Sequence, residues 1–173
     1  REELLFDAHG DEGRVSKNGK VIFQRGVVGL YRKGYKGSQS AQVWLWDNNK
    51  FTRLVAEEGG SRSPRWDVND GSYYYISGKS GAFNLYKRSI NGDDEKKITH
   101  FEDDSVMLPS VSRDGNIIVF RYLAEFHKID FSKGEIKPEK IVIWNRGERT
   151  GSREEERLEI RTAGQAVFSK DGL

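Results

Sequence analysis

The chain has 173 residues, of which 35% are hydrophobic and 32% charged, and it contains no cysteine. This composition allows one domain with a thin or layered core, and it excludes disulfide bridges and thiolate metal sites. The 29 Lys and Arg residues nearly balance the 27 Asp and Glu residues, so the charge gives no reason to expect a nucleic-acid partner. No apolar stretch is long enough to span a bilayer, and no membrane insertion is expected.

A short pattern recurs four times along the chain. Each copy is a short strand, a Ser or Asp, and a turn that ends in Asn-Gly or Asp-Gly; the turn glycines are Gly19, Gly71, Gly115 and Gly172. Glycine and the Asn or Asp before it tolerate the positive φ angles of tight hairpin turns. The intervals of 52, 44 and 57 residues between these glycines are typical of β-propeller blades.

The segments between the turns predict the remaining strands of each unit. The apolar runs directly after the first three turns are expected to be strands buried on both faces: 21–23, 73–76 and 117–120. Third strands with rough alternation are predicted at 42–47, 83–88 and 125–130. After a further turn, fourth strands are predicted at 51–55, 96–99 and 140–143. Four short antiparallel strands per unit is the propeller pattern.

The predicted fold is therefore all-β, with about three four-stranded blades and the start of a fourth, an incomplete propeller. The approximate blades are 12–58, 63–101 and 108–143, followed by a charged insertion at 144–162 and the start of the next blade at 163–173. A β-sandwich with coincidental turn spacing is the alternative, but both halves of the unit recur in the same order. An open arc exposes apolar blade faces, so we expect it to pack against further blades of a longer protein or to self-associate.

The sequence contains no constellation typical of an active site. There is no Gly-x-Ser-x-Gly turn, and the three histidines, His9, His100 and His127, lie in different segments. The acidic clusters at 93–95 and 102–104 lack the spacing of a calcium loop. We therefore predict no catalytic, cofactor-binding or metal-binding residues, and no enzyme activity for this chain by itself.

One basic and aromatic segment is the best candidate for a contact with a substrate or another domain. It contains Arg32, Lys33, Tyr35 and Lys36 in a short loop, and loops on rigid scaffolds commonly carry function. Single-stranded nucleic-acid sites have a similar mixture, but one short loop in a nearly neutral chain does not favour that partner. For the tryptophans at positions 44, 46 and 66, we expect core packing for two of the three.

The repeat resembles the WD40-like blades of the TolB and tricorn families. The residues that carry the resemblance are Ser63-Pro-Arg-Trp-Asp with Asp70-Gly71, and two further copies at 108–115 and 166–172. A narrower resemblance, to the propeller region of bacterial tricorn-type serine proteases, lies in 31–38, 42–46, 79–86 and 98–101. One departure is that Trp66 is followed by Asp-Val-Asn-Asp rather than Ser-Pro-Asp.

The resemblance implies a peptide or protein partner. In tricorn-type proteases a PDZ module and a serine-protease core follow the propeller, and neither is present here. The implied function is a non-catalytic module that docks or gates peptides for such a protease, together with the remaining blades and catalytic domains of its parent. The alternative is a TolB-like periplasmic interaction scaffold. The implied compartment is the periplasm or the exterior of a bacterium, with the cytoplasm as the alternative.

Overall fold

The structure is a computed structural model and describes residues 4–29, 32 and 34–143. In this part of the chain there are twelve β-strands and one short 3-10 turn, with no α-helix. Accordingly, none of the described residues belongs to a helix that could cross a membrane. The predicted insertion at 144–162 and the predicted start of another blade at 163–173 lie outside the described residues.

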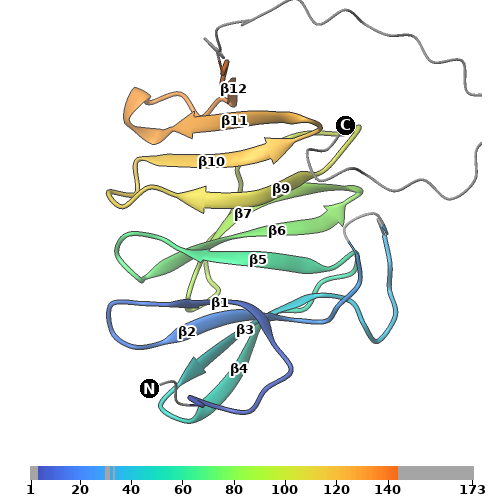
Figure 1. Ribbon diagram of the computed structural model, residues 1–173, viewed down its shortest axis with the longest axis vertical. Coiled ribbons are helices and arrows are strands. Elements are labelled where there is room, and N and C mark those ends of the chain that lie inside the picture. The colour runs from blue at the N-terminus through green and yellow to red at the C-terminus, as the bar shows by residue number, and fades with distance from the viewer. Residues whose placement is uncertain (1–3, 30–31, 33, 144–173) are drawn as a thin grey trace, which may run out of the picture. The chain divides into compact units, whose positions relative to one another are not determined.

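Three antiparallel sheets follow one another along the chain, each with its four strands in chain order (Figure 1). The first contains β1 (Asp11–Val15), β2 (Val21–Arg25), β3 (Gln42–Asp47) and β4 (Lys50–Val55). The second contains β5 (Ser61–Trp66), β6 (Ser72–Ser80), β7 (Ala82–Ser89) and β8 (Glu95–Lys97). The third contains β9 (Val106–Val111), β10 (Ile117–Tyr122), β11 (Glu125–Asp130) and β12 (Glu139–Lys140), with the 3-10 turn η1 (Phe131–Lys133) after β11. These sheets confirm the predicted all-β fold of four-stranded blades.

The first strands of the three sheets lie next to one another. β5 contacts both β1 and β9, which places the first strand of each blade innermost (Figure 1). Side chains join them: Glu12 Oε2 accepts a hydrogen bond from Arg65 Nη2 at 2.8 Å, and Arg65 Nε donates to the carbonyl of Pro109 at 2.8 Å. The blades therefore meet through charged and backbone groups at their inner edge.

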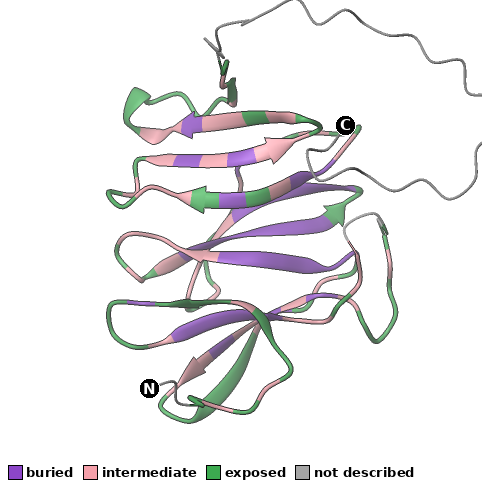
Figure 2. Ribbon diagram, in the orientation of Figure 1, coloured by how far each residue is buried: buried purple, intermediate pink, exposed green. Residues whose placement is uncertain are grey.

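Two apolar clusters fill the spaces between the sheets. The second sheet is buried on both faces: Tyr73 and Tyr75 pack toward the first sheet, while Tyr74 and Ile76 pack toward the third. Figure 2 accordingly shows most of β6 and β7 in the colour of buried residues. The first cluster also contains Ile22, Val43, Leu45, Val55 and Tyr86. The second also contains Phe83, Leu85, Ile98, Val106, Ile118, Phe120 and Ile129. Each cluster forms a single layer between neighbouring blades. This agrees with the thin or layered core that the composition predicted.

The third sheet differs from its prediction in two respects. Burial on both faces was expected for its second strand, but Ile118 and Phe120 are buried while Ile117 and Val119 are only half-buried. The reason is that no further sheet within the described residues covers the outer face of β10. The last strand also differs from the predicted 140–143, because β12 pairs with β11 at Glu139 and Lys140 and ends there, followed by one more backbone hydrogen bond from Ile141 to the carbonyl of Phe126 at 2.8 Å.

The turn between the first two strands shows one more difference. Gly19 and Gly115 have φ of 78° and 77°, and the amide of each donates to the residue three positions earlier. In the second sheet this place belongs to Asp70, with φ 53° and a 3.1 Å hydrogen bond to the carbonyl of Asp67. Gly71 is not in the left-handed region. The sequence pattern aligned Gly71 with Gly19 and Gly115, but the residue that corresponds to them in the structure is Asp70, so that alignment was wrong by one residue.

A charged network joins the connection after β4 to the second sheet. Lys79 Nζ lies 2.9 Å from Glu57 Oε1 and also contacts Glu95. Tyr75 donates its hydroxyl hydrogen to Glu95 Oε2 at 2.6 Å, and Ser77 donates to Glu57 Oε2 at 2.7 Å. Partial burial disfavours the charged form of Glu95, but the hydrogen bonds from Lys79 and Tyr75 outweigh it and lower the pKa of Glu95.

This network is expected to make the fold sensitive to acid. A carboxyl whose pKa is lowered in the folded state stabilises that state above its unfolded pKa, here close to 4.5, and loses this contribution as the pH falls through the folded value. We expect the urea midpoint to fall below about pH 4.5, and Glu95→Gln to remove part of that fall. Urea titrations at a series of pH values test this. Parallel curves for the two proteins would contradict it.

Candidate functional site

The connection between β2 and β3 is long and passes over the end of the first sheet. At its base Gly26 has φ +96°, and a Cβ there would lie 2.5 Å from the carbonyl oxygen of Ser40. The two arms of the loop approach each other this closely only because residue 26 has no side chain. The amide of Val28 bonds to the carbonyl of Gln39 at 3.3 Å, which closes the base of the loop.

A buried arginine from the second sheet holds this loop in place. Arg62 in β5 is 4% exposed, and its Nη1 donates to the carbonyl of Val28 at 3.1 Å. The guanidinium carbon lies 4.5 Å from the centre of the Phe83 ring, and Nε has no hydrogen-bond partner among the described residues. Burial lowers the pKa of Arg62, but an arginine keeps its charge in proteins. The loop is therefore fixed to a neighbouring blade rather than supported only by its own sheet.

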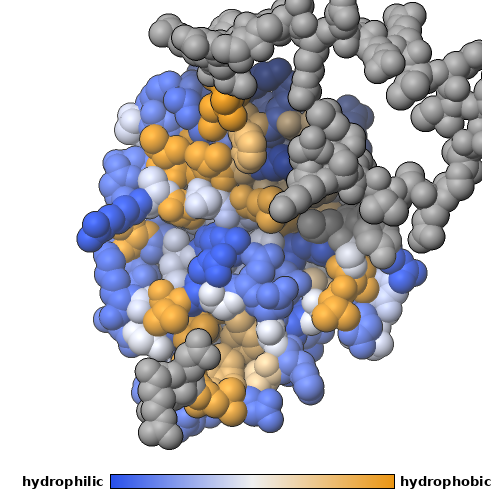
Figure 3. All heavy atoms as spheres, in the orientation of Figure 1, coloured by the Kyte–Doolittle hydropathy of each residue, from blue (hydrophilic) through white to orange (hydrophobic). Residues whose placement is uncertain are grey.

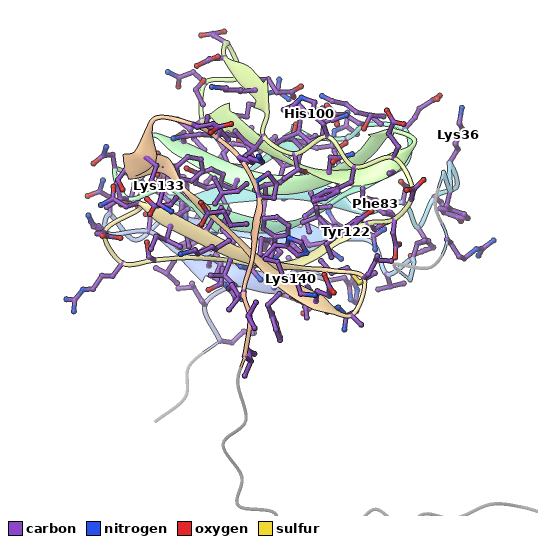
Figure 4. All side chains as sticks on the ribbon, turned by 90° about the horizontal axis from the view of Figure 1, so that it is seen from above. Lys36, Phe83, His100, Tyr122, Lys133 and Lys140 are labelled. Carbon is purple, nitrogen blue, oxygen red and sulfur yellow. The ribbon has the colours of Figure 1, made fainter. Side chains whose placement is uncertain are left out.

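The structure places three of the four predicted contact residues. Arg32 is exposed, and its guanidinium carbon lies 4.8 Å from the centre of the half-buried Tyr35 ring. Lys36 is exposed and lies 2.6 Å from Glu58 Oε2; its side chain projects from the edge of the structure in Figure 4. Lys33 lies outside the described residues. The loop thus presents one cation stacked on a ring and one cation paired with a carboxylate.

Next to the loop is a hollow of about 410 Å³ that the sequence reasoning did not find. Its floor contains Arg25, whose guanidinium carbon lies 5.0 Å from the centre of the Trp44 ring, and Gln42, which accepts a 3.1 Å hydrogen bond from Trp44 Nε1. His9 and the loop residues 38–40 form its sides. A second hollow, of about 210 Å³, includes Lys36 and shares Ser40 and Gln42 with the first. This surface offers a cation, an aromatic face, amide groups and hydroxyls, the combination of aromatic and polar groups that is typical of ligand sites.

The tryptophans explain why the hollow was missed. Core packing was expected for two of Trp44, Trp46 and Trp66, and all three are half-buried. Trp66 packs against the cluster between the first and second sheets, and Trp46 stacks on Phe6 with ring centres 5.1 Å apart, whereas Trp44 lines the hollow. In β3 the buried side chains are Val43 and Leu45, and the alternation of a strand therefore turns Trp44 and Trp46 to the other face. A tryptophan at position 44, on the face of β3 opposite to the buried side chains and next to a long loop, is the feature of the sequence that could have indicated this hollow.

The histidines and carboxylates do not form a common site in the described residues. His100 is exposed (Figure 4), and His9 lies at the hollow. His127 stacks on Phe120 at 5.9 Å, and the nearest carboxylate oxygen to its Nε2, from Glu125, is 3.6 Å away. No group of three or more possible metal ligands occurs within 4–29, 32 and 34–143.

Comparisons with known proteins agree with this architecture. The tricorn protease homolog of Saccharolobus solfataricus is 29% identical over 125 residues, covering 70% of this chain and 11% of that protein. The tricorn protease of Thermoplasma volcanium is 26% identical over 125 residues, covering 71% and 12%. The solved tricorn protease superposes with a TM-score of 0.60 at 23% identity, covering 77% of this chain and 12% of that one. This chain is related to the TolB/tricorn-type β-propellers.

Other comparisons bear on the propeller alone. TolB from Acinetobacter baumannii superposes on this TolB/tricorn-type propeller with a TM-score of 0.55 at 14% identity, covering 70% of this chain and 30% of that one. That likeness shows the fold. No family model matches the chain. The chain spans 11–12% of the length of the curated relatives named above, so it corresponds to a small part of each.

Proposed function

We propose that this chain is a non-catalytic propeller module that docks or gates peptide substrates for a tricorn-like serine protease whose catalytic domains lie elsewhere in a longer protein. The observation that carries the proposal is the hollow over Arg25, Trp44 and Gln42, beside a loop that Arg62 fixes to the next blade. Peptide backbones offer carbonyls to the guanidinium and the amide, and their side chains can pack on the indole ring. Lys36 lines the smaller hollow that shares Ser40 and Gln42 with this one, and Arg32 is exposed in the same loop.

The partners under this proposal are peptides and the rest of the parent protein. The outer face of the third sheet supports the second of these, since Phe126 is 46% exposed there while Leu85, at the corresponding place in the second sheet, is fully buried. We propose that a further blade of the parent covers this face. A dimer measured by light scattering would point to a second copy instead.

A peptide-binding titration tests the docking function. The probe is fluorescein-labelled oxidised insulin B chain, an unfolded peptide, followed by anisotropy against the full chain. We expect binding that Arg25→Gln weakens by about tenfold, because a charge-assisted hydrogen bond is lost. Trp44→Leu, which keeps an apolar side chain, should weaken it as well. Arg113→Gln removes the same charge from an exposed turn and should leave binding unchanged.

The results also separate the alternative function. No binding by the unaltered chain would remove the docking proposal, and peptide hydrolysis by the chain alone would contradict its non-catalytic role. A TolB-like scaffold in the periplasm is the second candidate, supported by the TolB superposition. It predicts that crosslinking recovers a folded protein partner and no peptides. A periplasmic or secreted parent and a cytoplasmic one are both compatible with the docking role.

A further inference from the structure

A second cavity, of about 470 Å³, lies between the second and third sheets. It is at the opposite end of the strands from the β2–β3 loop, because it is lined by residues of the β5–β6, β7–β8 and β9–β10 turns and of η1. Figure 4 shows the two ends: Lys133 of η1 lies on one side of the structure and Lys36 on the other. The docking surface described above therefore does not include this cavity.

Two lysines share one wall of the cavity. Lys87 in β7 and Lys96 in β8 are register partners, so their side chains leave the same face of the sheet next to each other. Lys87 Nζ lies 2.7 Å from Asp67 Oδ2 and 5.1 Å from the centre of the Tyr74 ring. Lys96 is exposed and has no ion pair with any residue that the structure describes. Like charges opposite each other destabilise a sheet, and a bound anion would relieve this repulsion.

Three groups of the protein donate to the carboxylate of Asp67. It accepts hydrogen bonds from the amide of Val68 and the hydroxyl of Ser72, both at 2.9 Å, in addition to Lys87. Burial disfavours its charged form, but these hydrogen bonds outweigh that effect and lower the pKa of Asp67. Asp67 therefore stays ionised near neutral pH and holds Lys87, which leaves Lys96 as the available cation.

Arg88 also lines the cavity, but its charge is paired elsewhere. Its Nη1 lies 3.8 Å from Glu95 Oε2, its register partner on the other face of the sheet, and its Nη2 donates to the carbonyl of Gly92 at 3.4 Å. The second carboxylate on the wall is that of Asp94, an exposed residue. The two lysines thus face two carboxylates, and Lys96 is the cation that has no ion pair within the described residues.

The opposite wall is apolar and comes from the third sheet and the segment after it. The Phe131 ring stacks on Tyr74 with centres 5.9 Å apart and planes 22° apart. Ile136, which is 37% exposed, extends this surface, while the buried Ile98 adds an apolar side chain beside Lys96 on the second sheet. A cavity with an unpaired cation on one side and an aromatic and aliphatic wall on the other is suited to a ligand in which an anionic group is attached to an apolar group.

We propose that this cavity binds a carboxylate next to an apolar side chain of a peptide, with Lys96 as its charge partner and Phe131 and Ile136 against the apolar neighbour. The carboxylate is either an Asp or Glu side chain or the C-terminus of the peptide. This inference rests on the proposed function in taking the ligand to be a peptide. It adds a second contact at the other end of the blades, with a preference for acidic sequence.

Three labelled peptides test the inference with the full chain. The first is Ser-Leu-Glu-Leu-Ser with a C-terminal amide, the second has Gln in place of Glu, and the third is the Gln peptide with a free C-terminus. We expect the first or the third to bind about tenfold more tightly than the second, according to which carboxylate is recognised. Lys96→Gln should reduce the tighter binding to the level of the second peptide.

Lys97→Gln is the matched control. Lys97 is the next residue of β8, and its side chain points to the other face of the sheet, so the same charge is removed outside the cavity. Binding in this variant should stay within about twofold of the unaltered chain. Equal losses in Lys96→Gln and Lys97→Gln, or equal binding of all three peptides, would overturn the inference.

The outcome can be separated from that of the docking proposal. If Arg25→Gln weakens binding of the insulin B chain but Lys96→Gln leaves carboxylate-dependent binding unchanged, this inference fails and the proposed function stands. If Lys96→Gln abolishes the carboxylate preference while Arg25→Gln has no effect on either probe, the cavity binds peptides and the hollow beside the loop does not. Thermal unfolding followed by circular dichroism confirms that each variant is folded.

Discussion

Replacing Phe83 by alanine is expected to lower the free energy of unfolding by about 3–5 kcal/mol. Phe83 in β7 is fully buried in the cluster between the second and third sheets. Its removal leaves a cavity in a layer that is only one side chain deep on each side, so neighbouring groups have little freedom to fill it. The ring also lies 4.5 Å from the buried guanidinium of Arg62, which would lose its aromatic contact.

A urea titration of the full chain measures this loss, with Phe126→Ala as the control. Phe126 in β11 has the same side chain but is 46% exposed, so its removal should change the free energy of unfolding by less than about 1 kcal/mol. Similar losses in both variants would mean that the outer face of the third sheet is packed in solution. That result would favour self-association over a face that stays open in the isolated chain.

The strands and turns were predictable because they depend on short-range chemistry. A turn was expected between the strands predicted at 42–47 and 51–55, and Asn48 and Asn49 form it with φ of 47° and 62°, which Asn tolerates better than most residues. The bounds of β3 and β11 agree with the predicted 42–47 and 125–130. Alternation and turn residues are properties of neighbouring positions, so a single sequence contains them.

The position of the left-handed turn residue was not predictable to within one residue. In Asp70-Gly71 both residues tolerate positive φ, and local chemistry gives no reason to prefer Asp70. The choice matters because it fixes which tyrosine of the following run faces which sheet: Tyr73 and Tyr75 face the first, and Tyr74 faces the third. A shift of one residue exchanges the two faces of a strand.

The candidate site was predictable only in part, because its geometry depends on contacts between blades. A basic and aromatic loop was visible in the sequence, and Arg32 and Tyr35 do lie together. The arginine that anchors the loop at Val28 is 34 residues away, in a strand whose pattern gives no reason to expect a buried cation. Likewise, the cavity at Lys96 forms from two sheets, and nothing within either sheet predicts its volume.

Gly59→Ala is expected to lower the free energy of unfolding by about 2–5 kcal/mol, from left-handed strain and backbone overlap together. Gly59 has φ +87°, and a Cβ there would lie 2.8 Å from the carbonyl oxygen of Gly78. The neighbour is backbone, so it cannot turn away as a side chain would. Urea unfolding measures the loss, with Gly34→Ala as the control, since Gly34 has φ +70° and nothing within 4 Å of its added Cβ.

The control separates the two causes, because Gly34→Ala should cost only the strain, about 1–2 kcal/mol. Equal losses at both positions would show that the approach of the two chain segments is not tight. Gly60 accepts a 3.0 Å hydrogen bond from the amide of Gly78 and donates to the carbonyl of Glu57 at 3.2 Å, so displacing this connection moves Glu57 away from Lys79. The backbone contact between two blades thus positions the ion pairs that join them.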